Sequence, residues 1–240
     1  SITIGLVAAR RVKTSSDYAN AGRSLPSYIV IATVFATWFG SETVLGIPAK
    51  FADSGLRGVI EDPFGASLCL IFVGLFFARK LYRMNLLTIG DYYRQRYSRS
   101  VEIIVSCCIV ISYLGWVAAQ ITALGLVFSI LSQGAISISS GMVIGAAIVL
   151  VYTLFGGMWS VALTDFFQMI IIVVGLLYIA YVVADLAGGA GVVIDHAAGA
   201  GKLAFWPQPT AAEILAFAGA AVTIMFGSIP QQDVFQRVMS

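Results

Sequence analysis

Six apolar runs, each long enough to cross a lipid bilayer, decide what this chain can fold into. The runs lie near residues 28–49, 60–78, 101–131, 138–156, 160–184 and 211–229. A spanning α-helix needs about 20 predominantly apolar residues, so each run can supply one. Only 11% of the residues are charged, against roughly 25% in a soluble domain. The sequence therefore predicts an all-α transmembrane protein whose surroundings are a lipid bilayer.

Both ends of the chain lack a polar tail. Residues 1–9 read as the last turns of a further span, and the chain stops directly after Arg237-Val238-Met239-Ser240. We therefore expect a piece of a longer protein, with one partial and six complete spanning helices.

The basic residues indicate which ends of the spans face the cytoplasm. If the spans alternate, only Lys50, Arg57 and Lys202 of the 14 basic residues fall on one side. The positive-inside rule makes the other side cytoplasmic. We expect residues 10–27, residues 79–100 and Arg237 to be cytoplasmic, in a plasma (inner) membrane. A net charge of +2 gives no reason to expect a nucleic-acid partner.

The second helix carries polar residues in mid-span. Gly40, Ser41, Glu42 and Thr43 interrupt its apolar run, and Pro48 follows. Broken helices with unwound carbonyls at mid-membrane hold sodium and substrate in secondary transporters. The alternative is a kinked helix whose small residues allow close packing. Glu42 favours the functional interpretation, because packing has no use for a carboxylate in the membrane.

Asp165 opens the run at 160–184, after the glycine pair Gly156-Gly157. An ionisable group at the start of a span is a functional candidate, because an isolated charge in hydrocarbon is costly. The alternative is an interfacial carboxylate that the dipole of its helix stabilises.

Four further polar or aromatic residues are candidates for contact with a solute. Trp116 and Gln120 are four residues apart and share one helix face. The alternatives are a bond from Gln120 to a neighbouring helix, and packing or interfacial anchoring for Trp116. Gln231 follows Pro230 where the last apolar run breaks. Asp62 lies beside Glu61 at the external end of its span, where a solvated acid is the alternative.

Three segments resemble the sodium/solute symporter family. The stretch Gly156–Gln168 is similar to that family's signature, and Gln236-Arg237 matches its second signature region. The segment from Ala19 to Leu25 resembles the start of its first core helix. The likeness extends over nearly the whole chain, in order and with suitable spacing.

The resemblance implies two inverted repeats of five helices, preceded by an extra helix. Residues 1–9 would then end the extra helix, residues 28–184 would form the first repeat, and residues 211–240 would supply the first helix of the second repeat. The rest of that repeat, which would come from the remainder of the same protein, is not in this chain.

The resemblance also implies a site. The backbone carbonyls of Ala36 and Phe39 would bind Na⁺, the coupling ion, and Asp165 matches an aspartate linked to sodium coupling. The substrate-contacting break would comprise Trp38, Gly40, Ser41, Glu42 and Thr43.

The substrate is left open by departures from individual carriers. Trp38 stands where proline carriers have an aspartate, and Thr43 replaces the Gln of the Glu-Gln pair of sugar carriers. The segments around Trp38 and Gly227–Arg237 are similar to choline carriers, but Gln231 replaces an aromatic residue there.

The function expected from this resemblance is sodium-coupled secondary active transport of a small organic solute by alternating access. The alternative is a symporter-like membrane sensor domain of a signalling protein. The sequence shows no nucleophile–base pair and no phosphate loop, so we do not expect an enzyme.

Overall fold

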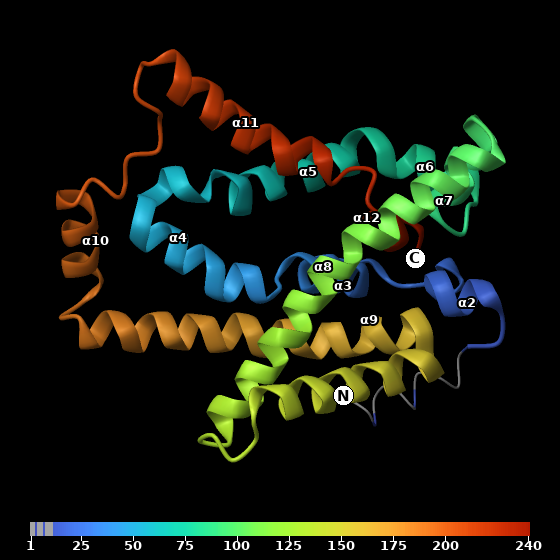
Figure 1. The fold of residues 1–240 in the computed structure, drawn as a ribbon, viewed down its shortest axis with the longest axis horizontal. Coiled ribbons are helices and arrows are strands. Elements are labelled where there is room, and N and C mark those ends of the chain that lie inside the picture. Colours follow the sequence, from blue (N-terminus) through green and yellow to red (C-terminus); the bar gives the residue numbers. More distant parts are fainter. Residues whose placement is uncertain (1–2, 4–6, 8–11) are drawn as a thin grey trace. The chain divides into compact units, whose positions relative to one another are not determined.

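The computed structural model describes residues 3, 7 and 12–240, and every regular element in this part is helical (Figure 1). The expected partial helix at residues 1–9 falls almost wholly outside the described residues. The elements up to the middle of the chain are α2 (Ser15–Asn20), η1 (Ala21–Arg23), α3 (Ser27–Trp38), η2 (Glu42–Gly46), α4 (Ile47–Ser54), η3 (Gly55–Val59), η4 (Ile60–Gly65), α5 (Ala66–Phe72), η5 (Val73–Phe77) and α6 (Ala78–Met84). They are followed by α7 (Ile89–Arg96), α8 (Arg99–Leu131), α9 (Ile138–Leu186), α10 (Ala190–Gly199), α11 (Ala211–Gly227) and α12 (Gln232–Met239).

The chain divides into two compact units. The first comprises Ser1–Ser41, Lys80–Phe166 and Pro230–Ser240, and the second comprises Glu42–Arg79 and Phe167–Ile229. Each unit is discontinuous in sequence, so each depends on contacts between segments far apart in the chain.

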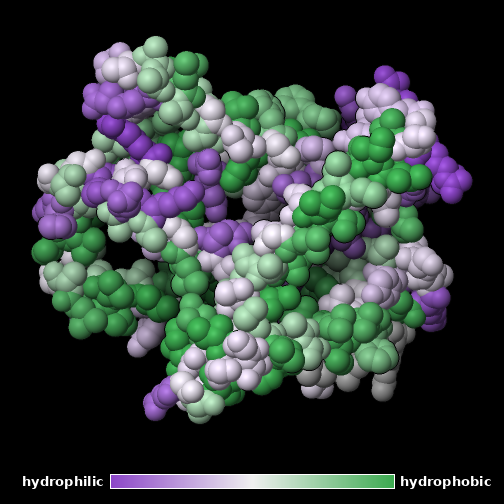
Figure 2. Space-filling view, viewed as in Figure 1, coloured by the Kyte–Doolittle hydropathy of each residue, from purple (hydrophilic) through white to green (hydrophobic). Residues whose placement is uncertain are grey.

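The surface of α8 is apolar along its length. Ile111, Leu114 and Leu131 all leave most of their side chains exposed, and Figure 2 shows apolar side chains along this helix. An apolar surface of this extent is unfavourable in water and favourable in lipid. This surface fits a helix that is embedded in a lipid bilayer.

Length and apolarity qualify three helical stretches of the described chain as spans. These are Glu42–Met84, Arg99–Leu131 and Thr153–Leu186, and α11 and α12 pass the same test only if the two are counted as one broken span. Two other apolar helices, Ser27–Trp38 and Ile138–Val151, are shorter than a bilayer requires. The six complete spans expected from the sequence therefore stay a prediction.

A turn at Gly157 divides α9. This residue has φ +48° and ψ −142°, and the chain doubles back there (Figure 1). A Cβ at this position would lie 2.5 Å from the carbonyl oxygen of Tyr18, and the Tyr18 hydroxyl donates to the carbonyl of Thr153 at 3.2 Å. Only glycine fits both the backbone angle and the close approach.

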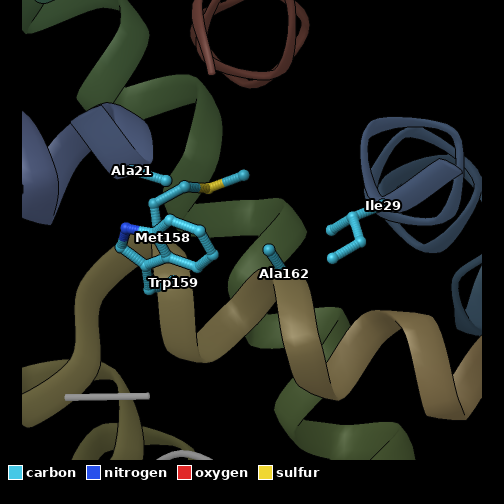
Figure 3. Packing of buried hydrophobic residues seen from close by; sticks show 5 residues of the cluster. All are labelled: Ala21, Ile29, Met158, Trp159 and Ala162. Carbon is cyan, nitrogen blue, oxygen red and sulfur yellow. The ribbon is translucent and has the colours of Figure 1, made fainter. Parts of the chain in front are cut away.

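The turn positions the first of two apolar clusters in the first unit. Met158, Trp159 and Ala162 follow it on α9 and are buried against Ala21 and Ile29. Figure 3 shows Ile29 of α3 pointing toward Ala162. This packing holds the start of α3 against the signature segment.

The second cluster joins α7 to α12. Leu86, Ile89, Phe235 and Met239 are buried together. Thr88 caps α7 in a reciprocal box with Asp91, which satisfies amide groups that the first helical turn leaves without partners. The connection at residues 79–100, which we expect to be cytoplasmic, therefore contains the helix α7.

In the second unit, α11 packs against η4 and α5. Phe72 and Phe226 stack with their ring centroids 5.7 Å apart. At the expected external end, the carbonyl of Lys202 accepts a hydrogen bond from the amide of Leu56 at 2.8 Å. The 186–210 loop expected there contains the helix α10.

We predict that Gly157→Ala lowers the free energy of unfolding by about 2 kcal/mol or more, because alanine is strained at positive φ and its Cβ meets a backbone oxygen. Gly175→Ala is the matched control, since it lies on the same helix with nothing within 4 Å of its added Cβ. The control should lose no stability, because alanine favours the helix by about 1 kcal/mol. Unfolding in detergent micelles measures both, and equal stability of the two variants would contradict the strain.

Candidate functional site

The helix α3 ends in mid-run, as the sequence predicted. Phe39 departs from helical geometry with φ −97° and ψ 69°, and its amide still donates to the carbonyl of Phe35 at 2.8 Å. The wide helical turn η2 begins at Glu42. Phe39 and Gly40 therefore interrupt the helix between Trp38 and Ser41, and we call residues 38–41 the α3 break.

The last four carbonyls of a helix have no acceptor role within that helix unless a cap supplies a donor. Phe35 has the amide of Phe39, and Ala36 is the next carbonyl along. These oxygens also carry the partial negative charge of the helix C-terminus. The end of α3 is thus chemically suited to a small cation.

Gln120 of α8 reaches the α3 break. Its Oε1 accepts a hydrogen bond from the amide of Ser41 at 3.2 Å. The sequence singled out Gln120 as a solute contact or an interhelical bond, and the structure shows the second of these. A backbone group freed by a broken helix must find a partner in the membrane, and Gln120 is that partner for Ser41.

Arg237 approaches the same helix end from α12. Its Nε donates to Thr37 Oγ1 at 3.0 Å, and its Nη1 lies 3.6 Å from the sulfur of Met158. The guanidinium also interacts electrostatically with Asp165. The two regions that resembled family signatures, around Asp165 and at Gln236-Arg237, are therefore brought together beside the last turn of α3.

The sequence placed Arg237 at the end of a span and in the second signature region, but did not name it as a site residue. The signal that could have identified it is its position in the second signature region, next to Gln236. The amide of Gln236 in turn donates to the carbonyl of Ala19, so this short stretch ties α12 to α2 as well.

In the second unit, the structure pairs two of the expected solute contacts. Thr43 Oγ1 donates to Asp62 Oδ2 at 2.9 Å. Asp62 has extended backbone angles, φ −137° and ψ 121°, inside η4. Its neighbour Glu61 forms a partly exposed ion pair with Lys50 at 3.6 Å. Glu42, at the start of η2, is exposed.

Trp116 and Gln231 line one cavity of about 200 Å³ in the first unit, together with Ser112, Tyr113 and Asp233. The sequence did not identify Ser112, Tyr113 and Asp233 as candidates, because nothing in their local spacing shows that α8 meets the start of α12. Among the described residues, no three His, Cys, Asp or Glu side chains come together as a metal-binding group.

Known proteins resemble this chain over its whole length. The high-affinity choline transporter 1 of Caenorhabditis elegans is 27% identical over 257 residues, which cover 100% of this chain and 42% of that protein. The sodium/proline symporter of Escherichia coli is 28% identical over 200 residues, which cover 79% of this chain and 39% of that protein. The chain thus spans about two fifths of the length of these relatives.

Among solved structures, a substrate-bound, outward-open Na⁺-coupled sialic acid symporter matches with a TM-score of 0.84 and 22% identity. The match covers 98% of this chain and 51% of that one, and it shows that the two share a fold.

The model of one protein family, described as the sodium:solute symporter family, matches residues 18–240. This match includes the α3 break, Asp165 and Arg237, and it confirms the resemblance seen in the sequence. The chain belongs to the sodium:solute symporter family.

Proposed function

We propose that the protein acts in sodium-coupled secondary active transport of a small organic solute, by alternating access. The observation that carries this proposal is the α3 break, where Arg237 bonds Thr37 in the last turn of α3 and also interacts electrostatically with Asp165. Relatives whose names specify choline, proline or sialic acid support a small solute without deciding which one.

The sodium site that we propose is formed by the backbone carbonyls of Ala36 and Phe39, with Asp165 acting on the ion electrostatically. Na⁺ and the Arg237 guanidinium are both attracted to the end of α3, and they repel each other there. Asp165 offsets that repulsion because it supplies the opposite charge. Sodium binding would then favour the state in which the solute site is complete, which gives the two ligands a positive coupling.

The solute site that we propose is formed by residues of the α3 break and by residues expected near it. It comprises Trp38, Gly40, Ser41, Glu42, Thr43, Asp62, Trp116, Gln120 and Gln231. Of these, Gln120 bonds the amide of Ser41, and Asp62 bonds Thr43. Gln120 therefore holds the backbone of Ser41 in place, and Asp62 holds the hydroxyl of Thr43, in addition to any contact with solute.

The family fold suggests how this part fits into a complete carrier. We propose that residues 28–184 form one five-helix repeat, that residues 211–240 begin the second, and that the remaining length of a full-length protein supplies the rest. Residues 10–27, residues 79–100 and Arg237 would face the cytoplasm from a plasma (inner) membrane, in keeping with their basic character.

Uptake by the full-length protein in liposomes tests the proposal. An inward Na⁺ gradient should drive accumulation of a solute from a panel of choline, proline, sialic acid and sugars, and an equal K⁺ gradient should not. Solute binding without accumulation would instead favour a membrane sensor.

We predict that Asp165→Asn raises the sodium concentration for half-maximal uptake about tenfold or more, because removing one charge near a cation costs on the order of 1 kcal/mol or more. Solute affinity at saturating sodium should change far less. Asp185→Asn, an exposed carboxylate at the far end of α9, is the control and should leave sodium activation unaltered. Unchanged sodium activation in Asp165→Asn would remove Asp165 from the coupling.

We predict that Thr37→Val lowers the free energy of unfolding by about 1.5–3 kcal/mol, because a half-buried guanidinium loses a charged hydrogen bond. Thr122→Val is the matched control. The Thr122 hydroxyl donates to the carbonyl four residues earlier, at 2.8 Å, as Thr37 does at 2.7 Å, but it lies on an exposed face. Thr122→Val should lower the free energy of unfolding by no more than about 0.5 kcal/mol. Unfolding titrations in mixed micelles compare the two, and equal losses would show that Arg237 contributes nothing at this position.

A further inference from the structure

The cavity beside α8 and the start of α12 has a carboxylate in its wall. Its lining residues are Ser112, Tyr113, Trp116, Gln231 and Asp233, and all lie in the first unit. At about 200 Å³ it is smaller than the 300–1,000 Å³ typical of ligand pockets. It is therefore suited to a compact solute or to one polar group of a larger one.

Two hydrogen bonds join Tyr113 to Asp233, one through the carboxylate and one through the backbone amide. The Tyr113 hydroxyl donates to Asp233 Oδ1 at 2.7 Å, and the backbone amide of Asp233 donates to the Tyr113 hydroxyl oxygen at 3.2 Å. Tyr113 is itself held by an edge-on contact with Trp116, whose ring centroid is 6.1 Å away. The acid is thus preorganised in the wall of the cavity and cannot turn freely.

The carboxylate of Asp233 has no ion-pair partner in the part of the chain that the structure describes. Among the described residues, no Lys, Arg or His nitrogen lies within ion-pair distance of its carboxylate. Arg237 interacts electrostatically with both Asp165 and Asp233, but its hydrogen bonds go to Thr37 and Met158. The Asp233 carboxylate thus has a hydrogen-bond donor but no ion-pair partner among the described residues, and an ionised acid inside a membrane protein calls for a cation.

The other lining groups indicate which kind of cation. The Asp233 carboxylate, the Ser112 hydroxyl and the Gln231 amide oxygen are hydrogen-bond acceptors, which suit a cation that carries N–H groups. A quaternary ammonium has no N–H group and is bound best by several aromatic faces. This lining offers one Trp and one Tyr, and the Tyr hydroxyl is already bonded to Asp233.

We propose that this cavity binds the protonated primary amine of the transported solute, with Asp233 as its counter-ion and Tyr113 as the residue that positions the carboxylate. The inference rests on the proposed transport function and narrows its substrate class to amines.

Calorimetric binding to the full-length protein, with ethanolamine and choline as probes, tests the proposal. The two molecules share one skeleton and differ in the methyl groups on nitrogen. Measurements in NaCl and in KCl at equal ionic strength separate an amine from sodium itself. We expect ethanolamine to bind at least about tenfold more tightly than choline, because only its ammonium can donate hydrogen bonds to the acceptors of the lining.

Asp233→Asn should weaken ethanolamine binding about tenfold to a hundredfold, because it removes a charged hydrogen-bond acceptor. Asp195→Asn, an exposed carboxylate on α10, is the matched control and should bind ethanolamine as the unaltered protein does. Tyr113→Phe keeps the ring and the charge but frees the carboxylate, so it should give a smaller loss, and it serves as the test if Asp233→Asn does not fold.

The proposal is overturned if ethanolamine does not bind, if choline binds as tightly, or if neither Asp233→Asn nor Tyr113→Phe changes ethanolamine affinity. Sodium-driven uptake of an uncharged or anionic solute that is unaffected by Asp233→Asn would also overturn it, and would leave the transport function standing. Amine binding that depends on Asp233, in a protein without sodium-driven uptake, would support the amine site and reject the transport function.

Discussion

The constraint on which this structure depends is that a helix interrupted inside a membrane must find new partners for the backbone groups it releases. Water is absent from the hydrocarbon region, and an unsatisfied polar group there costs several kcal/mol. The break after Trp38 is tolerated because Gln120 accepts from the amide of Ser41 and Arg237 donates to Thr37 in the preceding turn. The interruption is therefore a property of α3, α8 and α12 together, and no one of these helices could maintain it alone.

The charged residues near the α3 break are also related to the end of that helix. Arg237 is favourable at the end of α3 because helix C-termini carry partial negative charge, and Asp165 and Asp233 lie within its electrostatic reach. Sodium at the carbonyls of α3 and an amine beside Asp233 would each bring a further positive charge to this group, so the two proposed ligands would interact with the same charged residues.

Much of the fold could be predicted from local sequence. Gly, Ser and Thr within an apolar run predicted the break after Trp38, and the pair at Gly156-Gly157 marked the division of α9, because backbone preference is read from neighbouring residues. The contacts of the site could not be predicted in this way. Ser41 and Gln120 are 79 residues apart, Tyr113 and Asp233 are 120 apart, and Thr37 and Arg237 are 200 apart. Such pairs depend on how helices pack, which no local pattern contains.

The bond between α7 and α12 has a mechanical consequence. The amide of Ile89, at the first position of α7, donates to the side chain of Gln232 at 2.9 Å, while Asp91 and Thr88 serve the neighbouring amides. Any tilt of α12 away from α7 removes the acceptor of the Ile89 amide, at a cost of about 1–3 kcal/mol if no water replaces it. Separation of α7 from α12 therefore requires another interaction that compensates for the lost hydrogen bond between Ile89 and Gln232.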